Sequence, residues 1–467
     1  MKAFSRFPRQ RLCCLIAITV FLTCNKIIRQ RGKQDLKRAL TITACIAVLL
    51  AALSETADAA GPDLLGPGVR SRVLGGGAVA DIADWTTVYW NPAGLTELED
   101  GIFGMNVSHR WSRRRSSKSM PNVSYPDIYQ GEFQKVYPVE SDTFFRHRIS
   151  NSVSGVQMGL CYNAKYFALG GLNMPATSIN TYFADRAPAT SGDMTYGKYQ
   201  STIAVLSVPV AAAVPIGNKL SVGAAVHGRM GWRKLYQAKQ YAPTSAISPY
   251  SAYFTERDEY LIGYAASVDL ALLYKPKKKL RIGLVVRTPY KFRFAGTGER
   301  YSSITGVKEE TDALTRMYYP LQVDAAVAYR LGNDSTISLS FRHTSWNTLR
   351  FSTNYRSNSI NFIDHSYDMK MRQTLEVGIG FTAALSELVH LFAGIRYEPS
   401  PYGRDHASLS TEFYPNALAL GLGIEYRLEN AVIRFGVIDR TCDRRRHGGH
   451  AYGQDDTEIG ISIDVGF

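Results

Sequence analysis

The sequence predicts an all-β fold: a transmembrane antiparallel β-barrel of about 14 strands with a small N-terminal hatch plugging the lumen. Apolar and polar residues alternate along most of the chain, the connections between alternating runs are short and long in turn, and tyrosines recur at one end of several runs. Alternation places the two kinds of side chain on opposite faces of a strand. We predict three parts: a signal peptide with a long N-terminal extension at 1–59, a hatch or plug at 60–100, and the barrel at 101–467.

The first 59 residues are predicted to be a leader that is removed. Two apolar stretches, 12–24 and 39–53, are each shorter than the ~18–20 residues that a spanning helix needs. The second follows basic residues and ends at Ala57 and Ala59, which form an A-x-A cleavage signature. We predict cleavage after Ala59. The residues upstream of Lys37 are either a long n-region or the product of a start site set too early.

Composition and charge exclude several classes of protein. The chain has 467 residues with 54 Lys and Arg against 40 Asp and Glu, a net charge of +14. The leader holds ten of the basic and three of the acidic residues, so the net charge falls to about +7 without it. A nucleic-acid partner is therefore not expected, since it needs a basic face on the mature domain. Only Cys161 and Cys442 lie beyond the leader; this is no disulfide scaffold, and we expect two free thiols.

The alternating runs have the length of membrane strands. A soluble β-sandwich alternates too, but here the polar face mixes full charges with glycines, as expected for a wet and crowded lumen. The apolar face extends over ~10 residues, the length of a tilted transmembrane strand. Runs of this kind give fourteen candidate strands, near 101–112, 154–163, 166–174, 197–215, 219–235, 257–275, 279–296, 318–331, 334–352, 367–384, 388–401, 414–427, 430–443 and 458–467.

The connections between these runs differ in length by parity. After even-numbered strands they are tight and rich in turn residues, as at Gly217-Asn218 and Gly332-Asn333. After odd-numbered strands they are long, from roughly a dozen to nearly forty residues. Bacterial outer-membrane barrels have short periplasmic turns and longer extracellular loops. The pattern therefore predicts a multi-pass β-barrel in the bacterial cell outer membrane.

Aromatic residues fit the same location. Tyr274, Tyr329 and Tyr426 each lie where an even-numbered strand reaches its short turn, as a girdle at the membrane interface requires. Phe467, the last residue, fits the terminal aromatic residue that serves barrel insertion. We accordingly expect the outer-membrane barrel-assembly machinery as a partner.

Residues 60–100 do not alternate and include a glycine run and a turn, Gly75-Gly76-Gly77 and Asn91-Pro92-Ala93. One interpretation is a periplasmic linker. The other is a plug, because a barrel of this size would otherwise leave an aqueous hole. The glycine run is no phosphate loop, because it lacks the Gly-Lys-Ser/Thr ending.

The segment GGAVADIADWTTVYWNPAGL resembles the N-terminal hatch of the FadL-type long-chain fatty acid transporters of the outer membrane, whose hatch carries an Asn-Pro-Ala motif matched by Asn91, Pro92 and Ala93. Segments 281–296, 337–349 and 391–403 are also similar to family patterns. The resemblance is best over 60–112 and 257–467 and poorest over 113–256, where substrate-capturing loops would lie.

The resemblance implies passive uptake of long-chain fatty acids or other hydrophobic compounds through an internal apolar pocket, followed by lateral release. No cofactor is implied. The six hatch residues named above would lie near the substrate, and release would use a kink in the third strand. Gly170, Gly171 and Pro175 are the candidates for that kink, because glycine and proline weaken strand pairing.

Two other functions are compatible with a barrel of this kind. A FadL-related barrel could act as a shuttle or binding subunit of a protein-secretion system, and a general diffusion porin comes third. An enzyme is not expected: His343 and Ser345 lie two residues apart on one strand, about 7 Å by strand rise, too far for a nucleophilic pair. No metal motif is present. The Arg113–115 and Arg444–446 triplets in two long loops either bind lipopolysaccharide phosphates or are solvated charges.

Overall fold

The computed structural model describes residues 66–81, 84–98, 101–116, 125–126, 133–134, 146–162, 172–184, 194–241, 253–302, 306–332, 335–357, 362, 364–368, 371–401, 416–442, 445–447 and 450–467. The predicted cleavage site at Ala57 and Ala59 and the candidate kink residues Gly170 and Gly171 lie outside these ranges.

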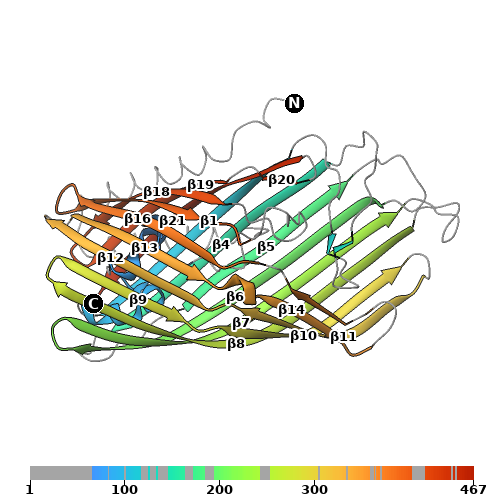
Figure 1. The fold of residues 1–467 in the computed structure, drawn as a ribbon, viewed down its shortest axis with the longest axis horizontal. Helices are drawn as coiled ribbons and strands as arrows, with labels where there is room; N and C mark the ends of the chain where they lie inside the picture. The colour runs from blue at the N-terminus through green and yellow to red at the C-terminus, as the bar shows by residue number, and fades with distance from the viewer. Residues whose placement is uncertain are drawn as a thin grey trace, which may run out of the picture. The chain divides into compact units, whose positions relative to one another are not determined.

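Nineteen strand segments form one antiparallel sheet, drawn in Figure 1. They are β1 (Gly101–Ser116), β4 (Arg146–Tyr162), β5 (Leu172–Ala184), β6 (Met194–Ile216), β7 (Leu220–Tyr241), β8 (Tyr253–Lys277), β9 (Leu280–Arg287), β10 (Tyr290–Ser302), β11 (Lys308–Tyr319), β12 (Gln322–Gly332), β13 (Ser335–Thr344), β14 (Arg350–Tyr355), β15 (His365–Asp368), β16 (Thr374–Ala384), β17 (Val389–Glu398), β18 (Ala417–Arg427), β19 (Ala431–Cys442), β20 (Arg445–His447) and β21 (His450–Gly466). A separate pair is formed by β2 (Tyr125–Pro126) and β3 (Phe133–Gln134).

The nineteen segments make fourteen strands that run the length of the barrel wall, which we call staves. In five cases a segment continues the preceding one along the same stave: β10 after β9, β12 after β11, β14 after β13, β16 after β15 and β20 after β19. The pairing of the strands agrees with this division. β8 pairs with both β9 and β10, and on their other side β9 pairs with β12 and β10 pairs with β11. The sheet closes because β1 pairs with β4 on one side and with β21 on the other. The predicted barrel of about 14 strands is confirmed.

Strand ends differ from the prediction on the side of the long connections. The third stave, β5, runs over Leu172–Ala184 rather than 166–174. β10 and β11 are separated only by residues 303–307, where a loop of about twenty residues was predicted. The physical reason is that a strand beyond the membrane has polar residues on both faces, as at Thr297–Ser302, and therefore shows no alternation. Arg113–Arg115 likewise lie in β1 and Arg445 and Arg446 in β20 rather than in loops; their side chains are outside the described part.

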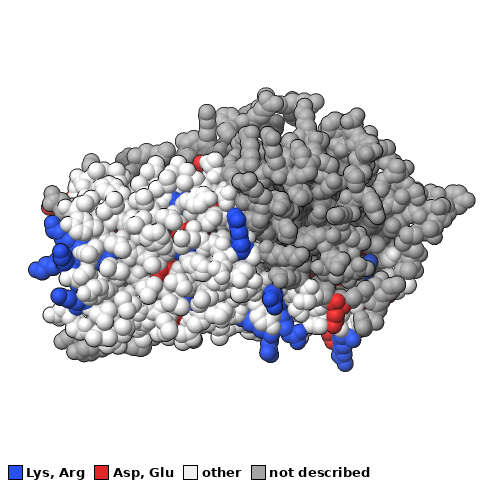
Figure 2. Space-filling view, in the orientation of Figure 1, with Lys and Arg blue, Asp and Glu red and all other residues white. Residues whose placement is uncertain are grey.

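The outward faces form an apolar belt bounded by tyrosines. On β8, Tyr264 and Tyr274 are exposed, and between them Val268 and Leu270 are exposed as well. Ten residues of a strand tilted by ~40° rise about 25 Å, the height of the apolar band of outer-membrane barrels. Figure 2 shows a largely uncharged surface between groups of Lys and Arg at its two borders. Of the three tyrosines predicted to form the girdle at the short turns, Tyr274 and Tyr329 are exposed, and Tyr426 is half-buried.

Both ends of the barrel wall meet at the C-terminus. Phe467 donates its backbone N–H to the Gly101 carbonyl oxygen (3.0 Å), and Gly101 N donates to the Phe467 oxygen (3.3 Å). The Phe467 ring is two-thirds exposed. Its recognition by barrel-assembly machinery stays a prediction.

The N-terminal segment consists of short helices that pack inside the staves. They are α3 (Val69–Val73), η1 (Gly77–Val79), α4 (Thr87–Trp90) and η2 (Pro92–Glu97). In Figure 1 these blue elements lie behind β12, β13 and β16, near the end where the short turns gather. We call residues 66–98 the hatch. Among the described residues, no helix has both the length and the apolar character that crossing a membrane requires.

Candidate functional site

Glycines on the inner wall form the seat of the hatch. Gly380, Gly394 and Gly421 are in register across β16, β17 and β18, beneath α3. A Cβ at Gly380 would lie 2.8 Å from the Leu74 carbonyl oxygen, and one at Gly421 would lie 2.9 Å from Val73 Cα. Hatch backbone thus occupies the space that side chains would fill. The glycines on the polar face of the strands therefore make room for the hatch. The sequence predicted a crowded lumen but not that the hatch would contact these glycines.

The Trp85 ring occupies a recess in the inner wall, which we call its socket. Gly104 on β1 and Gly159 on β4 are directly opposite each other, and a Cβ on either would collide with the Trp85 ring. The ring is buried, and the Cys161 thiol contacts the Trp85 carbonyl oxygen at 3.5 Å. Cys161 is a free thiol, whereas the Cys442 side chain lies outside the described part. No sequence pattern predicted this contact of Trp85.

The Asn-Pro-Ala turn joins the hatch to the wall. Asn91 accepts a hydrogen bond from Ala93 N (3.1 Å), capping η2, while Pro92 occupies the first turn, where its missing N–H costs nothing. The Asn91 Nδ2 group donates to the Val79 oxygen (2.6 Å) in η1 and to the Leu272 oxygen (3.3 Å) in β8. One buried amide therefore connects two hatch segments and a barrel strand.

Buried ion pairs complete the attachment. Arg434 on β19 pairs with Glu425 (2.6 Å between Nε and Oε2) and with Asp464, and its Nη1 lies 3.7 Å from the Asp84 carboxylate of the hatch. Within the hatch, burial alone would lower the pKa of the Arg70 guanidinium. The nearby carboxylates, led by that of Asp81, outweigh this effect of burial and leave the pKa raised. Breaking one partner of such a pair leaves an uncompensated buried charge, which is strongly destabilising.

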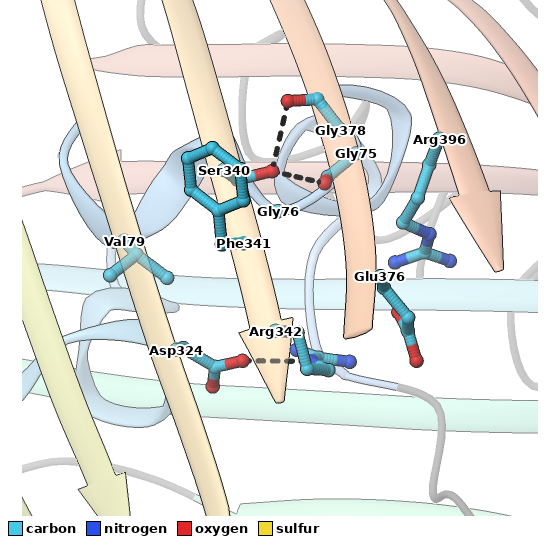
Figure 3. Close-up of a pocket in the computed structure, with 10 residues that line it drawn as sticks. All are labelled: Gly75, Gly76, Val79, Asp324, Ser340, Phe341, Arg342, Glu376, Gly378 and Arg396. Atoms are coloured by element: carbon cyan, nitrogen blue, oxygen red, sulfur yellow. Dashed lines mark hydrogen bonds and ion pairs between the residues drawn. The ribbon is translucent and has the colours of Figure 1, made fainter. Parts of the chain in front are cut away.

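A small charged recess lies where the glycine run meets the wall (Figure 3). Its lining includes Asp324, Arg342, Glu376 and Arg396. Ser340 donates to the Gly75 carbonyl oxygen at 2.7 Å. Gly75 and Gly76 have φ values of 64° and 97°, a left-handed conformation that glycine adopts without strain. The predicted glycines thus form a turn against the wall, in polar surroundings.

Farther from the short turns, the inner wall becomes apolar. We call this set the apolar cluster; it contains Val205, Leu261, Phe292, Phe294, Ala313, Met317, Tyr319, Trp346, Leu349, Tyr355, Phe362 and Met371, all buried. The Phe292 and Phe294 rings stack at 4.9 Å between centroids, and Phe292 meets Tyr319 edge-on at 5.9 Å. A lumen that only conducted water would present polar side chains here.

Arginines border this cluster: Arg257 lies over the Tyr355 ring, and Arg229 lies at the Tyr290 side. Arg229 on β7 is 9% exposed, and its guanidinium carbon lies 4.2 Å from the centroid of the Tyr290 ring, which stacks on Tyr319 at 4.6 Å. Nη1 donates to the Ser267 hydroxyl, whereas Nε has no hydrogen-bond partner in the described part of the chain. Among the described ion pairs, none includes Arg229. An anionic group entering the cluster would find a desolvated donor.

Of the predicted site residues, the hatch set lies together at the wall, and Pro175 lies in β5, opposite Gly155 of β4. Signals that could have found Trp85 and Arg229 were weak, since a lone tryptophan or arginine fits many roles. Within the described ranges, no group of three or more His, Cys, Asp or Glu side chains is placed to hold a metal ion.

A closed antiparallel barrel with an apolar belt outside and a docked hatch inside is an outer-membrane β-barrel of the plugged class. The chain belongs to the family described as outer membrane protein transport protein (OMPP1/FadL/TodX), whose model matches residues 50–433. The predicted family and location are confirmed. No curated protein matches the chain in sequence.

Solved structures share the fold at low sequence identity. A Pseudomonas aeruginosa FadL homologue aligns with a TM-score of 0.65 at 12% identity, over 87% of this chain and 100% of its own. The toluene transporter TodX of Pseudomonas putida aligns with a TM-score of 0.62 at 14% identity, over 87% and 99%. The toluene transporter TbuX of Ralstonia pickettii aligns with a TM-score of 0.60 at 18% identity, over 87% and 99%.

Proposed function

We propose that the protein carries hydrophobic compounds across the outer membrane by passive diffusion, and that long-chain fatty acids are its main substrates. The observation that supports this is the apolar cluster on the inner wall, in a barrel interior that elsewhere also holds buried charges. Each buried CH₂ contributes about 0.8 kcal/mol, so a long chain gains several kcal/mol by entering the cluster. A cargo-holding secretion subunit needs no apolar interior, which is why transport is the preferred function.

Arg229 supports a fatty acid over a neutral hydrocarbon. A carboxylate hydrogen-bonded to a buried guanidinium gains about 1.5–3 kcal/mol, and the buried Nε group of Arg229 has no hydrogen-bond partner among the described residues. The aliphatic chain would then lie along Phe292 and Phe294. Toluene, the compound in the names of two structural relatives, has no group that uses this donor.

The uptake function is tested with a deletion strain and two matched variants. Phe294→Ala removes an inward ring of the apolar cluster, and we expect uptake of labelled oleate to fall by about five- to tenfold, because an aromatic contact and its buried area are lost. Phe381→Ala removes an outward ring that is 43% exposed and should leave uptake unchanged. Unchanged uptake in a clean deletion of the gene would refute the proposal.

Lateral release is proposed to occur beside Pro175. β5 pairs with β4 at Leu172–Pro175 and Asn180–Ala184, and with β6 at Asn173 and Ala176–Ala184. The ladder on the β4 side is therefore interrupted at Ala176–Ile179 within this described strand. Proline cannot donate to the ladder, which supports an opening at this point.

Replacing Pro175 with a residue that has a backbone N–H should narrow that opening. We expect Pro175→Val to slow uptake of labelled oleate several-fold while leaving its equilibrium binding to the purified protein unchanged. Pro209→Val is the matched control, because Pro209 lies in the continuous β6–β7 register opposite His227. Equal uptake by both variants would place the exit elsewhere.

A further inference from the structure

Four cations gather on the outer wall at Lys291, Arg293, Arg316 and Arg350, on the neighbouring segments β10, β11 and β14. We call this set the outer cation patch. Its side chains alternate with the buried Phe292, Phe294 and Met317, so they point away from the lumen. Figure 2 shows Lys and Arg gathered at the lower edge of this face, over these same segments.

Tyrosines fix the depth of the patch in the membrane. Arg293 is in register with Tyr264 of β8, one of two exposed tyrosines, with Tyr260, on the side of the apolar belt away from the short turns. Tyr318 is in register with Lys291 on one side and with Arg350 on the other. Interfacial tyrosines lie at the headgroup level. The patch therefore lies at the headgroups of the leaflet opposite the short periplasmic turns, which is the outer leaflet.

Within the described part of the chain, the charges of the patch have no carboxylate partner at ion-pair distance. Arg293 and Arg316 are directly opposite each other across the β10–β11 ladder, an arrangement of like charges that destabilises a sheet. Lys291 lies over the Tyr318 ring at 4.6 Å, and Arg316 donates to the Asn354 Oδ1 atom at 2.6 Å. Among the ion pairs of the described residues, none includes a member of the patch.

Neighbouring carboxylates do not remove the surplus. Glu299 and Asp312, farther along β10 and β11, pair with Lys308 and Arg356. Asp368 has its backbone in register with Arg350, and subtracting its formal charge from the four leaves three. The patch therefore carries a surplus of positive charge relative to the described carboxylates beside it.

We propose that the outer cation patch binds the phosphate groups of a phosphorylated glycolipid of the outer leaflet, the chemistry that lipopolysaccharide presents. Arginine forks bind phosphate oxygens in pairs, and an anion between Arg293 and Arg316 converts their repulsion into two attractions. The acyl chains of the same lipid would lie along the apolar belt below Tyr264. This inference is independent of what the lumen transports.

The test compares two double variants with the same loss of charge. Arg293→Gln with Arg316→Gln removes the centre of the patch, whereas Lys277→Gln with Lys278→Gln removes two exposed charges at the β8–β9 turn on the periplasmic side. Each full-length protein is purified from outer membranes in mild detergent, and the glycolipid retained per barrel is measured by mass spectrometry. We expect the patch variant to retain roughly thirtyfold less, since each of the two cations removed contributes about 1 kcal/mol near an anionic lipid surface, and the turn variant to retain the normal amount.

Binding to vesicles identifies the group that is recognised. Purified wild-type protein should bind vesicles that contain bis-phosphorylated lipid A more tightly than vesicles with the dephosphorylated lipid, and inorganic phosphate at the same concentration should not compete. Equal retention by the two double variants, or equal binding to both vesicles, would overturn the proposal. Heat-dependent gel mobility shows that each variant is folded, and normal oleate uptake by the patch variant separates this site from the transport function.

Discussion

Gly223→Val is expected to open an ion-conducting path through the barrel. Gly223 lies on the inner face of β7 beneath the Asn-Pro-Ala turn, where a Cβ would be 2.5 Å from Ala93 N and 2.6 Å from the Pro92 carbonyl carbon. These are backbone atoms, so no rotation relieves the collision, and overpacking of this kind costs about 1–3 kcal/mol. The population with a displaced hatch should rise about ten- to a hundredfold, seen as ion conductance in planar bilayers.

Gly228→Val is the matched control, since no atom lies within 4 Å of a Cβ at that position of the same strand. Its ion conductance should be as low as that of the wild type, and deletion of residues 60–100 should give the largest conductance. Equal conductance of the Gly223 and Gly228 variants would contradict the docking argument. High conductance of the wild-type protein would show that the hatch does not plug the lumen.

Arg229→Met is expected to weaken binding of a fatty acid about ten- to a hundredfold and to leave binding of a neutral hydrocarbon of equal length unchanged. Methionine keeps the apolar reach of the side chain but removes the guanidinium, whose hydrogen bonds to a carboxylate contribute about 1.5–3 kcal/mol. Calorimetry with purified protein, oleate and an alkene of matched length measures both dissociation constants.

Arg293→Met serves as the control for general loss of charge, because Arg293 points outward from the same wall. It should leave both dissociation constants unchanged. If Arg229→Met weakens the binding of oleate and of the neutral compound equally, the Arg229 side chain shapes the apolar cluster but does not bind the carboxylate. If neither changes, the fatty acid binds elsewhere in the barrel.

Much of the wall was predictable because a membrane strand obeys a rule of period two. Outward positions such as Val268 and Leu270 must be apolar, and a tyrosine such as Tyr274 marks the interface, so local sequence suffices to place them. The same rule fails beyond the membrane. There both faces of β10 carry mainly polar residues over Thr297–Ser302, and the alternation that predicted the strand disappears although the backbone pairing continues.

The interior was less predictable. The Asn91 motif indicated a hatch, but its partners, Val79 and Leu272, are 12 and 181 residues away in the chain. Likewise, Gly104 and Gly159 form one socket only because β1 and β4 pair in the register that places them opposite each other. Nothing local to a glycine indicates which side chain will occupy the space beside it.

The sequence alone determined the number of staves, the membrane-facing surface and the presence of a hatch, since each follows from contact between a residue and its solvent. The tertiary structure decided where the hatch is docked, where the lumen turns from charged to apolar, and that Arg229 and the apolar cluster are neighbours. These depend on closure of the barrel, which brings residues from distant staves together across the interior and gives each an environment that its own segment does not contain.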